Sequence, residues 1–191
     1  MLRHDLDMMH IEKNVVDNVI GIVLNMDGKT KDNLKARIDL KDMGIRSELY
    51  LKELGSDKTY KPPACFEMTT SKKYSFLQVL KGVSVSDVYA SNVSRCAKLK
   101  ERKTSAMKSH NSHILMQQLF PIGIRGFLSD EVSKHLIELS CFFREICSKV
   151  LSLENLESLQ KRIAVTLCEL ERIFPPSLFL YSYGTSTHSF D

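Results

Sequence analysis

The sequence predicts a mainly α-helical protein. Three observations carry this prediction: apolar residues recur at the spacing of one helical face in successive stretches, capping side chains precede several of these stretches, and Gly or Pro ends them. With 191 residues, of which 43% are hydrophobic, the chain can bury one substantial core and has room for a small second unit. No apolar run approaches the ~20 residues of a membrane-spanning helix, so no membrane partner is expected.

Residues 8–25 form the first predicted helix, which a turn at Asp27-Gly28 ends. The apolar residues that share its face are Val15, Val16, Val19, Ile20, Val23 and Leu24. His10 and Glu12 would lie in the first turn, where unpaired backbone N–H groups favour negative charge. A carboxylate fixed there can hold a divalent metal; the alternative is an ordinary acidic first turn.

The second predicted helix, Lys31–Lys41, is more polar, and Gly44 fits its C-terminal cap. Its charges alternate in sign, with Asp32 and Arg37 among them, and this pattern is typical of a solvated face. Residues 45–68 show no sustained period and contain a Pro-Pro pair, which stiffens the chain and blocks a helix. We therefore expect a linker there, with a domain boundary close to that pair.

Residues 69–178 are predicted to fold as one helical domain. Its first helix would end at Gly82, with Thr70 or Ser71 as the cap, and residues 83–93 would form a short strand or a loop. A short helix over residues 110–120 would follow, capped by Ser109 and ended by Pro121.

The two strongest helical patterns come last. Ser129 is placed to cap one and Ser152 to cap the other, and each carries a continuous apolar stripe. A short turn joins them, so we expect antiparallel packing. Pro175-Pro176 would close the second helix, and the polar residues 179–191 are expected to be a disordered tail.

The basic charge of the chain is concentrated in its middle. Residues 46–128 hold 14 basic and 6 acidic residues, whereas the segments on either side carry a small acidic excess. The candidate nucleic-acid-binding residues are Arg95, Lys98, Lys100, Arg102, Lys103 and Lys108. Such a cluster can contact phosphates without reading bases, and no aromatic residue interleaves to stack on single strands. The alternative is a solvated basic loop.

His110 and His113 lie three residues apart, a spacing that places two ligands on one helical face. Zinc takes three or four ligands, and no acid or cysteine lies near in sequence, so we favour packing against Gln117. The five cysteines include no Cys-x-x-Cys pair, which indicates reduced thiols in the cytosol or nucleus.

Several longer sequence motifs are interpreted together. His4 to Val15 reads His-x-Leu-Asp-x-Met-His-x-Glu-Lys-Asn-Val, and Leu24-Asn25-Met26-Asp27-Gly28-Lys29-Thr30-Lys31-Asp32 follows. The further motifs, in chain order, are Pro62-Pro63-Ala64-Cys65, Lys108-Ser109-His110, Ile124-Arg125-Gly126, Ile146-Cys147-Ser148-Lys149-Val150 and Phe174-Pro175-Pro176-Ser177. Up to about Phe179 the chain resembles plant CACTA-type (En/Spm-like) DNA transposases, while residues 180–191 depart from that family's pattern.

The resemblance implies that residues 1–44 correspond to the distal end of a ribonuclease-H-like catalytic domain. The helical domain of unassigned function that follows it in that family would then correspond to residues 69–178. Strand transfer by such enzymes uses three carboxylates that hold two metal ions. The resemblance makes Glu12 a candidate for the third carboxylate, and His4 with His10 a candidate half of a zinc-binding element. It also implies a nuclear protein.

The other two acids and the cysteine half of the zinc element would lie upstream of Met1. We therefore expect a transposon-derived fragment without a cofactor of its own and without autonomous catalysis. Glu12 would turn its carboxylate toward solvent, and the first helix would either dock on the helical domain or remain poorly anchored. The alternative function is a helical module that binds a protein partner or the DNA backbone. A weaker alternative is a small metal-dependent hydrolase using His110 and His113. No small-molecule substrate is indicated.

Overall fold

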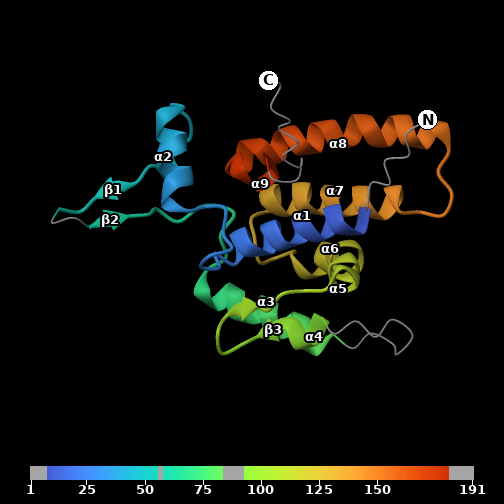
Figure 1. Cartoon of the computed structure of the whole chain (residues 1–191), viewed down its shortest axis with the longest axis horizontal. Helices are drawn as coiled ribbons and strands as arrows, with labels where there is room; N and C mark the ends of the chain where they lie inside the picture. The colour runs from blue at the N-terminus through green and yellow to red at the C-terminus, as the bar shows by residue number, and fades with distance from the viewer. Residues whose placement is uncertain (1–7, 56–57, 84–92, 181–191) are drawn as a thin grey trace, which may run out of the picture.

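The computed structural model describes residues 8–55, 58–83 and 93–180 (Figure 1). The prediction of a mainly helical fold is confirmed, and the strands described form only two short antiparallel hairpins. A continuous hydrophobic core runs through the described parts of the chain, from Val15 to Leu178. No helix within the described ranges is both long enough and apolar enough to cross a membrane.

Helix α1 (Met8–Val23) lies in the middle of the molecule and buries the apolar face predicted from its spacing (Figure 1). It packs along α5 (Ser109–Ile114), and it also contacts α9 (Ser177–Leu180). Of the two expected alternatives, docking on the following helices or poor anchoring, the structure shows docking. Almost no solvent reaches its residues from Val19 to Val23, which shows that the helix is covered on several sides.

Helix α2 (Leu34–Asp42), the 3-10 turn Ser47–Leu49 and the hairpin of β1 (Lys52–Glu53) and β2 (Thr59–Tyr60) form an arm. The arm projects from the helical body in Figure 1. Asn33 caps α2, because its side chain accepts a hydrogen bond from the Ala36 N–H. Gly44, with φ of +68°, follows the end of the helix as the sequence predicts.

Two parts of the predicted linker 45–68, the turn at Leu49 and residues 62–68, pack into the fold, while the β1–β2 hairpin between them belongs to the projecting arm. The residues that these two parts bury are Leu49, Pro62, Ala64, Phe66 and Met68. The Met68 N–H donates to the Val23 carbonyl at 2.9 Å, and the Phe66 ring stacks on Phe174 with centroids 4.9 Å apart. The Pro-Pro pair does exclude a helix, but the apolar residues that flank it still pack into the core.

Helix α3 (Thr70–Gly82) is capped by Thr69, one residue before the predicted candidates, and its buried side chains are Phe76, Leu77 and Leu80. Helix α4 (Val93–Cys96) leads into the second hairpin, formed by β3 (Ala97–Lys98) and β4 (Lys103–Thr104). Most of the predicted strand or loop over residues 83–93 lies outside the described residues.

The predicted helix over residues 110–120 continues through its proline. It consists of α5, a π-helical turn (Leu115–Leu119) and α6 (Phe120–Gly123). Pro121 lies in the first turn of α6, where its missing N–H is tolerated after the wide π turn. Lys108, not Ser109, precedes α5, and its side chain makes no capping hydrogen bond.

Helices α7 (Asp130–Ile146) and α8 (Leu153–Ile173) form the predicted antiparallel pair, with α8 as an outer layer (Figure 1). Both predicted caps are confirmed, because Ser129 accepts from the Val132 N–H and Ser152 from the Asn155 N–H. Helix α8 ends two residues before Pro175, as predicted.

Candidate functional site

Glu12 lies on the buried face of α1, and its side chain is 0% exposed. Its Oε2 is 2.7 Å from Nδ1 of His113 on α5. The prediction that Glu12 faces solvent is wrong. Position 12 precedes Val15 and Val16 by three and four residues, so the helical spacing that buries those valines buries Glu12 with them.

Gln117 is a polar neighbour of this pair. Gln117 places its amide nitrogen 3.2 Å from the same His113 nitrogen and donates to the Phe143 carbonyl. The predicted packing of His113 against Gln117 is therefore confirmed. The second oxygen of Glu12, Oε1, is buried without a hydrogen-bond partner among the described residues. Burial raises the pKa of Glu12, although the hydrogen bond to His113 opposes this shift.

The described residues near Glu12 do not fit the divalent metal that the transposase resemblance implies. Glu12 and His113 supply two donor side chains, and the described part of the chain contains no group of three His, Cys, Asp or Glu residues placed to share an ion. His10 is exposed and His110 is also exposed, while His113 turns inward to Glu12. His4 lies outside the described residues. The arrangement is that of a buried polar contact between two helices.

The six basic candidates lie on or beside the β3–β4 hairpin, which gathers them at the surface. Lys98 and Lys103 are partners in the register of the hairpin, and Lys100 and Arg102 lie in its turn. Arg95 and Lys108 lie on the flanks, in α4 and immediately before α5. The sequence contains little signal for this hairpin, because each strand has only two residues.

One acid lies within the basic segment. Glu101 pairs with Lys103 at 2.7 Å, and this hydrogen bond lowers the pKa of Glu101. The cations of the hairpin outnumber this acid, so the surface remains basic.

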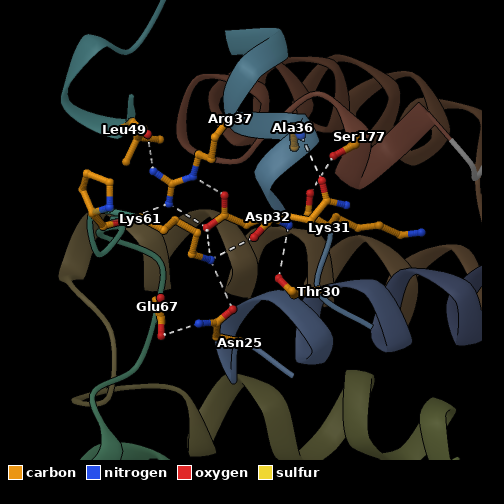
Figure 2. A network of polar contacts seen from close by, with 12 residues as sticks. Asn25, Thr30, Lys31, Asp32, Ala36, Arg37, Leu49, Lys61, Glu67 and Ser177 are labelled. Carbon is orange, nitrogen blue, oxygen red and sulfur yellow. Dashed lines mark hydrogen bonds and ion pairs between the residues drawn. The ribbon is translucent and has the colours of Figure 1, made fainter. Parts of the chain in front are cut away.

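Besides the Glu12 contact and the basic hairpin, a cluster of polar side chains lies beneath the arm. It was not predicted as a site. Figure 2 shows Arg37 reaching Asp32 and the Leu49 carbonyl. The guanidinium also donates to the Pro62 carbonyl at 3.2 Å. Lys61 donates to the Asp32 carboxylate at 3.1 Å. The predicted solvated face is wrong at these positions, since Arg37 is 0% and Asp32 2% exposed. Every hydrogen bond of the guanidinium goes to an oxygen of the arm or of the segments beside it, so the group fixes these segments to one another.

Comparison with known proteins adds one similarity. Residues 146–188 match the family described as a domain of unknown function, DUF4218. The match covers the last residue of α7, all of α8 and α9, and part of the tail that was predicted to depart from the transposase pattern. The disordered tail was predicted for residues 179–191; residues 179–180 instead belong to α9, and residues 181–191 lie outside the described residues. No curated protein and no solved structure matches the chain.

Proposed function

We propose that this chain is a transposase-related helical module that binds the sugar–phosphate backbone of duplex DNA in the nucleus and does not itself cut DNA. The order of its sequence motifs along the chain supports descent from a CACTA-type transposase. The similarity to DUF4218 over residues 146–188 is compatible with that descent, because it names a domain without an assigned activity.

The basic hairpin is the observation that carries the proposal. Residues 95–108 hold six candidate cations and one acid, and the fold places these cations at the surface. Cations of this kind attract phosphates by charge and release counterions from DNA, which requires little side-chain order. Aromatic rings are missing from the segment, so base stacking is not part of the binding mode. The binding should be weak, sensitive to salt and indifferent to sequence.

The environment of Glu12 supports the non-catalytic part of the proposal. A carboxylate that binds catalytic metal ions has to reach both the ions and the DNA. Glu12 is 0% exposed and hydrogen-bonded to His113, so it would have to leave the core and break this contact.

Fluorescence anisotropy with a labelled duplex over a range of salt concentrations tests the binding. Replacing the six cations with alanine should remove most of the affinity and reduce the salt slope by roughly 0.9 for each phosphate that the protein no longer neutralises. A matched pair of triple variants controls for net charge: Lys98, Lys100 and Lys103 to Ala against Lys134, Lys149 and Lys161 to Ala. Equal weakening of binding in the two triple variants, or no binding by the wild-type chain, would contradict the proposal.

The alternative is a protein-interaction module, and the arm favours it. Apolar side chains remain exposed there: Leu34 (53%), Ile38 (49%), Leu54 (67%) and Tyr60 (44%). Leu34 and Ile38 are one turn apart on α2 and therefore share a face. Sedimentation velocity of the wild-type chain and of a Leu34→Glu, Ile38→Glu variant shows whether this face mediates self-association.

A further inference from the structure

A cleft of about 440 Å³ lies between the loop that follows α1 and the basic hairpin. One wall consists of residues 24–27 and Lys29, and the other of residues 101–105. The volume falls in the range of about 300–1,000 Å³ that is usual for ligand-binding clefts. The cleft thus joins two parts of the chain that the sequence predicts to belong to different units.

Backbone contacts hold the first wall in place. The Met26 N–H donates to the Gly21 carbonyl at 2.9 Å, and the Lys29 N–H donates to the Met26 carbonyl at 3.0 Å. The loop approaches α1 so closely that a Cβ on Gly21 would lie 2.8 Å from the Lys29 carbonyl oxygen. Lys29 is therefore positioned by the helix and not by a free loop.

The second wall contacts the first. Thr104 of β4 and Met26 are both buried, and the Thr104 hydroxyl lies 3.7 Å from the Met26 sulfur. This contact places the hairpin directly against the loop. Arg102 adopts a left-handed backbone conformation (φ of 51°) in the turn of the hairpin.

The charges around the cleft favour an anion. Three cations, Lys29, Arg102 and Lys103, line it together with two acids, Asp27 and Glu101. Glu101 is already paired with Lys103. Among the described residues, no acid lies within ion-pair distance of Lys29 or Arg102, so these two cations are available to a ligand.

We propose that the cleft is a phosphate subsite of the DNA-binding surface, in which Lys29 and Arg102 contact the same stretch of sugar–phosphate backbone. This inference rests on the proposed function and extends it. The basic segment 95–108 then forms one side of a groove whose other side comes from the loop after α1. The segment that the transposase resemblance marks as a catalytic remnant thus takes part in binding.

Variants of the full chain test the subsite. Lys29→Ala should weaken binding to a labelled duplex about fivefold at ~0.1 M salt and reduce the salt slope by roughly 0.9. Asp27→Asn, on the same wall, should strengthen binding because it removes a repelling charge. Gly21→Ala should weaken binding while keeping every charge, since it displaces the Lys29 backbone. Lys161→Ala on α8, in the layer far from the hairpin, should leave the binding unchanged (Figure 1).

The outcomes separate this inference from the proposed function. If the wild-type chain binds DNA and the six-alanine variant does not, but Lys29→Ala binds like the wild type, the cleft is not a subsite and the hairpin acts alone. If the wild-type chain binds no DNA, the proposed function fails and the subsite fails with it. A titration with inorganic phosphate at constant ionic strength is the last experiment. Saturable phosphate binding that Lys29→Ala abolishes, together with unchanged DNA binding by that variant, would overturn the subsite and reassign the cleft to a free anion.

Discussion

Nδ1 of His113 lies 2.7 Å from Oε2 of Glu12, although 101 positions separate the two residues in the chain. The contact joins α1 to α5 and gives a partner to the fully buried Glu12 carboxylate, which would be costly to leave unpaired. Glu12 and His113 therefore form a specific polar contact between α1 and α5. The carboxylate that the transposase resemblance marks for catalysis is committed to the fold.

Truncating Glu12 should destabilise the chain. Glu12→Ala removes the hydrogen-bond partner of His113 and leaves space in the core, so we expect the free energy of unfolding to fall by about 1–3 kcal/mol. Glu12→Gln retains the shape and an acceptor oxygen and should cost less. Urea denaturation measures both variants. Equal stability of Glu12→Ala and the wild type would show that the contact does not hold α1 in solution.

The stability of the chain should depend on pH through Glu12. Burial raises its pKa in the folded chain above the ordinary value, so between the two values the folded state binds a proton that the unfolded state has released. The contribution of Glu12 is therefore most favourable below the unfolded pKa and declines as the pH rises through the folded pKa. Unfolding free energies measured on both sides of this window should show the decline in the wild type. Glu12→Gln should show a flatter profile, and identical profiles would contradict the assignment.

Breaking the buried ion pair of the arm should be costly. Arg37→Met leaves the Asp32 carboxylate buried with only partial compensation from Lys61, so we expect the free energy of unfolding to fall by about 3 kcal/mol. The double variant Asp32→Asn, Arg37→Met should be more stable than Arg37→Met alone, because it removes the stranded charge. Lys61→Ala, at a partly exposed position, should cost less than either. Denaturant titrations rank the three variants, and an Arg37→Met chain as stable as the wild type would show that the network is not needed.

Removing the acid of the hairpin should improve DNA binding. Glu101→Gln eliminates the ion pair with Lys103 at 2.7 Å and frees that cation for a phosphate. Affinity should rise by a few-fold at low salt, and the salt slope should steepen by up to roughly 0.9. Glu154→Gln at the start of α8 serves as the charge-matched control. An affinity gain in both variants alike would indicate a general charge effect instead of a local contact.

Features that neighbouring residues determine can be predicted from the sequence. The caps at Ser129 and Ser152 and the turn at Gly44 depend on side chains within three positions of the helix ends, and the structure confirms each of them. The burial of Asp32 cannot be predicted in this way, because the partners that make it tolerable, Arg37 and Lys61, include one on a distant segment.

Glu12 differs from Asp32 in one respect. The burial of Glu12 can be predicted from the spacing of the valines after it. The identity of its partner, His113, cannot be predicted, since no local pattern links positions 12 and 113. Composition alone identifies the basic residues, whereas their arrangement on a hairpin requires the fold. The prediction of a linker around Pro62 is wrong, because the loss of a helical pattern in the sequence does not show whether a segment packs into the core.

The central place of α1 has a consequence for synthesis of the chain. This helix is made before α5 and α9, which cover its apolar face and begin at residues 109 and 177. At about 5–20 residues per second, the ribosome leaves the valine-rich face without its partners for on the order of 10 s. During that interval α1 is a target for chaperones and for aggregation with other nascent chains. The yield of folded protein in a cell-free translation should therefore respond to added chaperone more strongly than refolding of the complete chain does.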